Sequence, residues 1–476
     1  MKTLRLVLGN LYLLLHIPFT TALAQKLFNL EQCIEYALQH NIQIKQAEIA
    51  SGIAAENKTQ SRASQLPVLN ASATHNYNYG RNVDPFTNQF TTSSIQSNNY
   101  SLTGSMVLFN GFQTRNNIKM NHYEHQAGLN QIQSAKDNVT LSVITSYLNV
   151  LYAHESLKAA QAQLELTEGL LQRTKKLVAS GIMSEYSVLE TEAQLYRERV
   201  AVVNCENQLQ LAYLDLRQTM DMPAEDSLRI VIPENTAFPD ISSIGGPKEI
   251  YETAVKNVPE IKYYEMKKMS AVAAWQQSKG RMSPRLSLNA SLSTLYSTSA
   301  RQITGAQING YNIIGITQNS SDTVLAPNRE FLYSIKPYQA QLRDNYNRFI
   351  GLSLSIPILN GWQTRTNIAK AKLSLINAEH DIMLSKRTLE KNIYNAHANA
   401  VAAFAAYKAA EKSLQSMQLL RQITERRVES GIATAHELSE VKTKLFAAET
   451  EFLKSKYDYL LKIKWIDYYK GVPIRL

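Results

Sequence analysis

The stretch LFNGFQTRNNI at residues 108–118 returns almost unchanged as ILNGWQTRTNI at residues 358–368. Each copy follows a run in which apolar and polar residues alternate, and each precedes a long segment rich in Ala, Leu, Gln and Lys. An Asn-Gly pair between two such patterns is typical of a turn, because both residue types adopt left-handed backbone conformations easily. The sequence therefore predicts the same strand-to-helix junction at two places in one chain.

Other matches in the same order indicate that the repeat covers nearly the whole chain. Pro67 matches Pro284 at an offset of 217 residues, whereas VASGIMSEYSVLE at 178–190 matches VESGIATAHELSE at 428–440 at an offset of 250. The change of offset from 217 to 250 places 33 extra residues between Pro284 and the second junction. A fixed order with one insertion indicates duplication of a single large unit rather than an array of short repeats.

The first 24 residues have the features of an export signal, namely Lys2 and Arg5, then an apolar run, then an Ala-Leu-Ala end. We expect residues 1–24 to be a signal peptide, followed by a first repeat at 25–246 and a second at 247–476. The apolar run is short for a membrane-spanning helix, which needs about 20 residues. No later window of the sequence is long and apolar enough to span a membrane as a helix.

Charge and cysteine content argue against a nucleic-acid-binding protein and against a disulfide-linked protein. The formal net charge is +10, but cationic and anionic residues are interspersed along the chain. A dispersed basic excess does not indicate a nucleic-acid surface, so we expect no nucleic-acid partner. Cys33 and Cys205 lie far apart and outside any metal-binding spacing, which favours two free thiols over a disulfide. The residues before Cys33 also lack the pattern of a lipid-anchored protein, so we expect no lipid anchor.

Four segments alternate between apolar and polar residues, as Leu286, Leu288 and Ala290 alternate with serine and asparagine. Such alternation predicts strands with one apolar and one polar face. Each repeat contributes one hairpin, and we expect its connecting segment to be polar, with the insertion in the second connection. A helical segment precedes each hairpin. The predicted helices are residues 29–64 and 247–282, the strands 69–79, 100–108, 286–296 and 350–358, and the connections about 80–98 and 297–347.

A very long helical region follows each hairpin, and a single matched glycine, Gly181 or Gly431, interrupts it. A lone glycine at the same place in both repeats indicates a turn between antiparallel helices. The helices that lead into the turns, at about 112–179 and 362–429, would each be about 100 Å long at 1.5 Å per residue. Their apolar residues have coiled-coil spacing. The predicted seam is Leu157, Ala160, Leu164, Leu171 and Val178 on one helix and Leu438, Val441, Leu445, Ala448 and Phe452 on a returning helix.

Four amphipathic strands cannot close a barrel, since they leave two unpaired edges. A strand of 10 to 12 residues, tilted by about 40°, crosses the roughly 25 Å apolar band of an outer membrane, where only closed β structures are stable. The export signal, the long helices and the strands together favour a membrane barrel built from several copies. Tyr77, Tyr79 and Tyr296 near one end of the strands suit an aromatic girdle. A soluble sheet with one hydrated face is the alternative for any single hairpin.

With these features the chain resembles the TolC-like outer membrane efflux proteins. The resemblance rests on the tandem repeat, LEQCIEYALQHN at 30–41, the two junctions, and the SGI turns at 180–182 and 430–432. It implies an α+β membrane protein that forms a homotrimer, with a 12-stranded β-barrel in the outer membrane and an α-barrel of 12 long helices in the periplasm. An equatorial region would come from residues 221–248 and from the segment after Trp465.

The resemblance also implies a function and partners. The protein would be a passive exit duct of a tripartite efflux or type I secretion system. It would contact outer membrane lipid, a periplasmic adaptor protein and an inner-membrane pump of the RND or ABC type. The adaptor would bind the helical tips, which are Ser180, Gly181, Ile182, Ser430, Gly431 and Ile432.

In this family two acidic positions on the returning helix of the second repeat line the narrowest ring of the periplasmic mouth. Counted from the turn glycine, these positions fall on Glu437 and Glu440, and Glu190 matches Glu440 in the first repeat. A ring of such carboxylates would favour cations. Glu437 and Glu440 also flank Leu438 and Val441, so on residue pattern alone they fit ordinary solvated positions of a coiled coil, and this alternative stays open.

One departure from the family concerns closure of the mouth. The best-known member uses an arginine two residues after the turn glycine, paired with an acidic residue of the first repeat. Here those positions are Ala433 and Ser187, so that ion pair cannot form.

We find no pattern of an enzyme or of a cofactor site. The nine histidines are scattered, and the chain has no H-E-x-x-H, no G-x-S-x-G and no phosphate-binding glycine loop. His436 beside Glu437 fits a helix surface better than a metal site. We therefore expect no enzyme activity, no cofactor and no metal. A secreted coiled-coil scaffold without a pore is the main alternative, and an exported enzyme a more distant one. The transported substrate, and whether the long 297–347 connection is a receptor surface or a lid, stay open.

Overall fold

The computed structural model describes residues 27–83, 88–92, 94–223, 228–232, 241, 244–430 and 432–472. The expected signal peptide therefore lies outside the described residues. The chain divides into two compact units. One contains the residues up to Ile53, His125–Lys267 and Glu379–Leu476, and the other contains Ala54–Glu124 and Lys268–Ala378. We refer to the first as the helical unit and to the second as the sheet unit.

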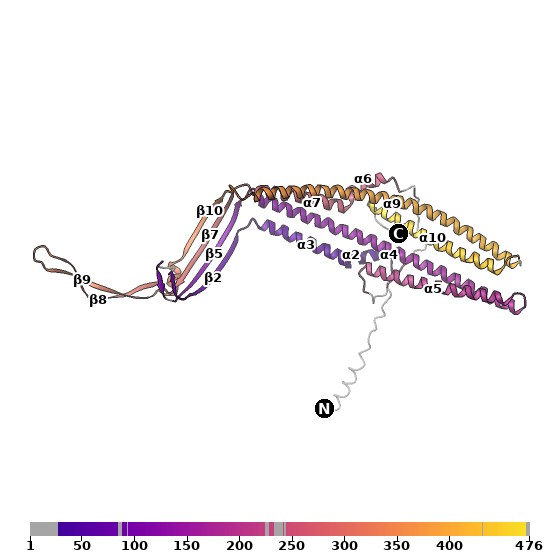
Figure 1. Cartoon of the computed structure of the whole chain (residues 1–476), viewed down its shortest axis with the longest axis horizontal. Helices are drawn as coiled ribbons and strands as arrows, with labels where there is room; N and C mark the ends of the chain where they lie inside the picture. Colours follow the sequence, from indigo (N-terminus) through magenta and orange to yellow (C-terminus); the bar gives the residue numbers. More distant parts are fainter. Residues whose placement is uncertain are drawn as a thin grey trace, which may run out of the picture. The chain divides into compact units, whose positions relative to one another are not determined.

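Long helices dominate the chain (Figure 1). The two longest, α4 and α9, have 67 residues each, and they begin and end within one residue of the predicted bounds. Each is followed by a helix of about half its length, α5 or α10. Each predicted N-terminal helix is split in two at a residue with extended backbone, Asn41 or Val258. The bounds are α2 Leu30–His40, α3 Ile42–Ala63, α4 Gln113–Ala179, α5 Glu185–Thr219, α6 Pro247–Asn257, α7 Pro259–Gly280, α9 Gln363–Glu429 and α10 Ala435–Lys470.

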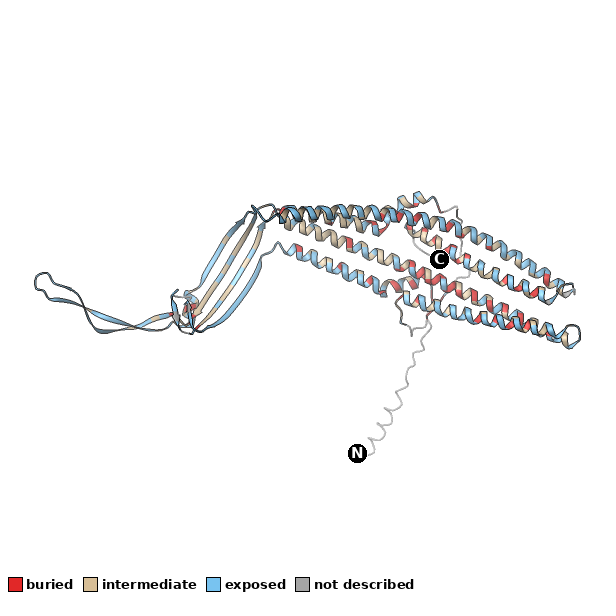
Figure 2. Ribbon diagram, in the orientation of Figure 1, coloured by how far each residue is buried: buried red, intermediate tan, exposed pale blue. Residues whose placement is uncertain are grey.

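The buried apolar residues of the helical unit form two clusters, and Figure 2 shows them in red along the helices. The first cluster surrounds Tyr147 of α4, whose hydroxyl donates to the carbonyl of Val231 at 2.7 Å. It includes the short parallel pair of β1 (Leu27–Phe28) and β6 (Arg229–Ile230). The second surrounds Tyr459 of α10 and Ile393 of α9. Burial thus holds α2 against α4 and α6 against α9 and α10.

The strands of the sheet unit form one antiparallel sheet in the order β10-β7-β5-β2. The register places Leu69, Gly104, Ala290 and Ile350 in one row across the four strands. Because directly opposite residues share a face, the predicted apolar residues lie together on one side of the sheet. β2 and β10 have one partner strand each among the described residues, so both edges of the sheet are open. The strands are β2 Val68–Asn78, β5 Ile95–Phe109, β7 Arg285–Ser297 and β10 Asn347–Ser355.

The repeated stretch forms the predicted junction in both copies. The Asn110 side chain accepts from the backbone N–H of Thr114 at 3.3 Å and donates to the Thr114 hydroxyl at 2.9 Å, at the start of α4. Asn360 makes the matching side-chain bond to Thr364 at the start of α9. The glycine and the aromatic residue after each asparagine have positive φ angles, between 57° and 65°. The Asn-Gly pair therefore caps a helix and reverses the backbone, as the sequence predicts.

Two predicted details are wrong. β10 ends at Ser355, before the predicted Ile358, because Pro357 has no N–H for a ladder. The segment after Trp465, which we expect to be equatorial, continues α10 to Lys470, and Gly471 caps the helix with a φ of 73°. On α4 the predicted seam residues Leu157 and Leu164 are only half-buried. The predicted Ala160 and Leu171 are buried, and the other buried positions of this stretch are small or polar, namely Ala153, Ser156, Gln163, Thr167 and Thr174.

The 297–347 connection is also different from the prediction. It contains two long strands, β8 (Arg301–Ile316) and β9 (Thr323–Ile335), and the short helix α8 (Tyr338–Asp344). It is not uniformly polar, since it exposes many isoleucines and aromatic residues. The first connection contains only a short hairpin of β3 (Arg81–Val83) and β4 (Phe90–Thr92), next to residues that the structure does not describe.

Candidate functional site

The turns at the ends of the helical hairpins expose apolar side chains. Gly181 has a φ of 73°, and the N–H of Ile182 donates to the carbonyl of Leu177 at 2.9 Å, which closes α4. In the second hairpin the N–H of Ile432 donates to the carbonyl of Arg427 at the same distance. Gly431, predicted to match Gly181, lies outside the described residues. Ile182 and Ile432 are both 70% exposed.

Glu437 has a structural role at the start of α10. The Thr434 hydroxyl accepts from the backbone N–H of Glu437 at 3.2 Å, and the Glu437 carboxylate accepts from the backbone N–H of Thr434 at 3.3 Å. This reciprocal pair is a capping box, which satisfies two helix-end donors. Arg427 of α9 lies 4.0 Å from the same carboxylate. Glu437 therefore joins the end of α9 to the start of α10.

We predict that Thr434→Ala loosens the first turn of α10. Loss of an N-cap side chain costs about 1 kcal/mol, which corresponds to roughly fivefold faster local opening. Amide hydrogen exchange of residues 436–438 measures it. Ser184→Ala is the matched control, because Ser184 occupies the N-cap of α5 without a side-chain capping bond. Equal acceleration in both variants would contradict the role of the capping box.

The other two predicted carboxylates have partners of their own. The Glu440 carboxylate accepts from the Lys444 ammonium at 2.8 Å, and this bond holds the pKa of Glu440 below its ordinary value. The Glu190 carboxylate lies 2.6 Å from Nδ1 of His436. The side chains of Glu437 and Glu440 are about half exposed, whereas that of Glu190 is more enclosed. Within one chain, therefore, each carboxylate is close to a basic side chain.

The Glu190–His436 contact joins the two helical hairpins, because Glu190 lies on α5 and His436 on α10. Sequence reasoning placed His436 on a helix surface, and it is 71% exposed at its side chain, yet it also makes this contact. Ser187 and Ala433, the positions at which the family's ion pair is absent, lie nearby in the sequence. Gln194 and Thr443 make a second, longer bond between the same helices, at 3.4 Å.

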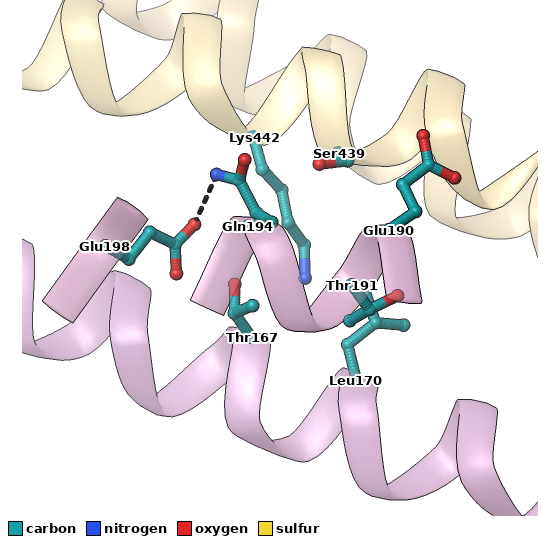
Figure 3. Close-up of a pocket in the computed structure, with 8 residues that line it drawn as sticks. All are labelled: Thr167, Leu170, Glu190, Thr191, Gln194, Glu198, Ser439 and Lys442. Carbon is teal, nitrogen blue, oxygen red and sulfur yellow. Dashed lines mark hydrogen bonds between the residues drawn. The ribbon is translucent and has the colours of Figure 1, made fainter. Parts of the chain in front are cut away.

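A small polar cavity lies between α4, α5 and α10, next to Glu190 (Figure 3). It has room for about one water molecule. In Figure 3 the Lys442 side chain reaches from α10 into this cavity. The remaining lining residues are Thr167, Leu170, Thr191, Gln194, Glu198 and Ser439.

A buried charge of each sign lies at this cavity. Lys442 and Glu198 are only 6% and 7% exposed. Oε1 of Glu198 accepts from Gln163 at 3.0 Å and from Gln194 at 2.8 Å, whereas Oε2 has no hydrogen-bond partner among the described residues. Burial lowers the pKa of Lys442 below its ordinary value, although the Glu425 and Glu198 carboxylates oppose this shift. The desolvation of Lys442 thus outweighs its attraction to the carboxylates.

We predict that Lys442→Met removes a pH dependence of the stability of the helical unit. With a lowered folded pKa, wild-type Lys442 loses its proton in the folded chain before the unfolded chain does, so wild-type stability rises with pH between the folded pKa and the ordinary 10.5. The variant should lack this rise. Melting temperatures at neutral and alkaline pH measure it. Lys444→Met is the control, because Lys444 is 57% exposed at its side chain.

We call the buried polar residues at this cavity, among them Lys442 and Glu198, the polar layer. Sequence reasoning did not find it. Its signal was present, since Lys442 falls four residues after Leu438 and three before Leu445, on the buried face of α10. A polar residue at such a position is unusual in a coiled coil.

The described residues contain no group of His, Cys, Asp and Glu arranged to hold a metal ion. Among the helices of the described part of the chain, none is long and apolar enough to cross a membrane.

Comparison with known proteins identifies the family. The profile of the family described as "Outer membrane efflux protein" matches residues 33–220 and 250–463. The outer membrane protein TolC of Escherichia coli K12 is 21% identical over 443 residues, covering 91% of this chain and 80% of TolC. Among solved structures, the CmeC outer membrane channel of Campylobacter jejuni aligns with a TM-score of 0.74 at 18% identity, covering 93% of this chain and 85% of CmeC. VceC of Vibrio cholerae aligns with a TM-score of 0.73 at 13% identity, covering 94% and 97%.

These matches extend over both repeats and over both the helices and the strands. They confirm the expected fold class, in which long helices and a β-sheet belong to one outer membrane channel chain. The chain belongs to the outer membrane efflux protein family.

Proposed function

We propose that this protein is the exit duct of an export system, working as a homotrimer in the outer membrane. Substrate would enter at the helical tips and leave through the barrel. The open edges of the four-stranded sheet are the observation that carries the proposal. In a bilayer each edge needs a partner strand, and three copies pair β2 of one chain with β10 of the next, giving a barrel of 12 strands.

An exposed seam on α5 supports assembly of the helices as well. Leu189, Tyr196, Val200 and Val203 are each about 60% exposed. They are spaced by seven, four and three residues, the spacing of a coiled-coil seam. The buried residues of α5, such as Leu195 and Val202, lie on a different face. One face of α5 thus packs within its own chain, and the other is free to pack on a helix of the next copy.

The proposed partners follow from the exposed ends of the molecule. The tips with Ile182 and Ile432 would bind a periplasmic adaptor, which connects the duct to an inner-membrane pump of the RND or ABC type. Glu437, Glu440 and Glu190 would line the mouth. The pump would supply the energy of transport, and the duct would catalyse no reaction.

Val203→Glu tests the proposal. A charge in the α5 seam should abolish the heat-resistant trimer and the export that depends on it, because burial of an unpaired charge is costly. Gln208→Glu adds the same charge at an exposed position on another face of α5 and should leave the trimer intact. Outer-membrane fractions examined on gels before and after heating give the readout. Wild-type protein that is absent from the outer membrane, or monomeric there, would support the coiled-coil scaffold instead.

A further inference from the structure

β8 and β9 form a two-stranded ribbon, residues 301–335, whereas the described residues of the first connection form only the short β3–β4 hairpin. The register between the strands shifts at three places, after Ile303, Ile308 and Ile313 of β8, and at the middle shift Asn328 of β9 is also unpaired in the register. Each shift inserts one extra residue into β8, which is a β-bulge. Gly310, with a φ of 84°, occupies the middle bulge, where the Asn309 side chain donates to Glu330 at 3.2 Å.

The bulges place most of the apolar residues of both strands on one face. Apart from Ile314, which directly follows Ile313 and is unpaired in the third bulge, successive apolar residues of β8 are three, two, three, two and three positions apart, a spacing that plain alternation would scatter over both faces. The register pairs each of them with an odd-numbered residue of β9. Directly opposite residues share a face. What we call the apolar face consists of Arg301, Ile303, Ala306, Ile308, Tyr311, Ile313 and Ile316, paired in that order with Ile335, Tyr333, Phe331, Arg329, Pro327, Leu325 and Thr323.

The opposite face is mainly polar or small. It contains Gln302, Gly305, Gln307, Asn312 and Gly315 of β8, paired with Ser334, Leu332, Glu330, Ala326 and Val324 of β9. The ribbon is therefore amphipathic, although Leu332 and Val324 add apolar side chains to its polar face.

The apolar face is uncovered within the chain. Ile303, Ile313 and Tyr333 are 58%, 65% and 56% exposed. An isolated two-stranded ribbon is marginally stable in water, and exposed apolar patches above about 300–600 Å² are rare on monomers. The apolar face of the ribbon therefore has to be covered by another surface.

Lipid is not the best candidate for that surface. β7, with 13 residues, spans about 40 Å at 3.3 Å per residue, already more than the roughly 25 Å apolar band. The ribbon begins only after β7, beyond a fully buried polar contact in which Gln341 of α8 bonds to both the N–H and the carbonyl of Ser297. Tyr100 and Tyr338 join their hydroxyls at 2.7 Å at the same end. A closed polar base thus separates the ribbon from the sheet.

We propose that the apolar face of the ribbon packs on the ribbons of the other copies, so that the three ribbons form one bundle at the strand ends remote from the junctions. This inference rests on the proposed trimer. Other copies of the chain are always present, unlike an external partner, and the trimer axis brings three identical faces together. The ribbon joins β7 to β10, the strand whose open edge would pair with the next copy, so this contact continues the proposed interface between subunits.

Two charged residues lie on the apolar face, Arg301 at its end, opposite Ile335, and Arg329 near its middle. Arg329 lies opposite Ile308. Its aliphatic stem can extend the apolar surface while the guanidinium reaches the edge of the ribbon. Glu330, which follows it, belongs to the polar face and is the nearest carboxylate in the sequence.

Cross-linking in the intact trimer tests the proposal. Ile313→Cys places a thiol on the apolar face, and Asn312→Cys places one on the polar face at the adjacent residue. With a short bismaleimide we expect two- and three-chain bands from Ile313→Cys and a single-chain band from Asn312→Cys. Ile308→Cys and Gln307→Cys form a second pair, in case one substitution impairs folding. Wild-type protein is the background control, because Cys33 is fully buried and Cys205 half-buried.

Each other outcome has a distinct meaning. Single-chain bands from both apolar-face variants, in protein that is still a heat-resistant trimer, overturn the ribbon contact and leave the proposed function standing. If the same thiols are also protected from maleimide in membranes and reactive in detergent, lipid covers the face. If they react freely in both, the face serves an external partner. Absence of the trimer in wild-type protein overturns the proposed function itself.

Discussion

Gly111→Ala should prevent assembly of the duct. Gly111 has a φ of 65°, which costs a residue with a side chain roughly 1–2 kcal/mol. In addition, a Cβ at this position would lie 2.4 Å from the carbonyl oxygen of Gly280 and 2.5 Å from Cβ of Ser283. A backbone carbonyl cannot move aside as a flexible side chain can. We therefore expect loss of the heat-resistant trimer, measured on gels of outer-membrane fractions.

The second junction supplies a matched control. Gly361 has the same sequence context and a φ of 57°, but a Cβ there would meet nothing within 4 Å in its own chain. Gly361→Ala should therefore incur only the conformational cost. Gly280→Ala should resemble Gly111→Ala, because its Cβ would lie 2.3 Å from the Gly111 carbonyl oxygen. Equal yields of trimer from the variants at 111 and 361 would exclude the close approach as the cause.

We expect loss of the contact between Gly111 and Gly280 to have a large effect on assembly, because this contact lies where the two hairpins of one chain are joined. The pairing of β5 with β7 joins the two hairpins of one chain, and it becomes irregular between Val107 and Phe109, just before the junction. The approach of Gly111 to Gly280 continues that joint from the strands to the start of α4 and the end of α7. Loss of the contact separates the hairpins that three chains have to contribute together.

The junctions and long helices were predictable because their determinants are local. Asn-Gly pairs, helical spacing and matched glycines determine the conformation of the chain within a few residues of themselves. Asn110 and Asn360 cap α4 and α9 where the sequence indicates, and both helices keep their predicted bounds. Because the unit is duplicated, each of these patterns occurs twice in the sequence.

The ribbon and the buried polar layer were not predictable, for different reasons. The three bulges of β8 break the period of two, so its isoleucines match neither a strand nor a helix until the register with β9 is known. The Lys442 layer depends on which helices meet. Glu198 on α5, and Gln163 on α4, which donates to Glu198, lie more than 200 residues earlier in the sequence than Lys442. The individual roles of Glu437, Glu440 and Glu190 at a mouth stay predictions.

The double variant Glu437→Gln with Glu440→Gln should lower the cation selectivity of the channel and can reverse it. Within one chain, Arg427 lies 4.0 Å from Glu437 and Lys444 lies 2.8 Å from Glu440. Removal of two carboxylates per chain leaves these cations uncompensated at the mouth, where like charges repel permeating cations. Glutamine at 437 can still complete the capping box with Thr434, so the start of α10 is retained. The reversal potential in a salt gradient across a planar bilayer measures the change.

Two further variants test this prediction, one expected to change the selectivity in the opposite direction and one expected to leave it unchanged. Lys444→Gln should raise cation selectivity, because it frees the Glu440 carboxylate. Glu451→Gln changes an exposed residue of α10 farther from the turn and should have little effect. All these shifts should weaken at high salt, since the screening length falls from about 10 Å at 0.1 M to about 3 Å at 1 M.

The contribution of Glu440 to the selectivity should also depend on pH. Because the bond to Lys444 lowers the pKa of Glu440, this contribution should persist on acidification to below the ordinary 4.5 and be lost only as the pH falls through the lowered value. A reversal potential that is the same in wild type, the double variant and Lys444→Gln would place these residues outside the conducting path.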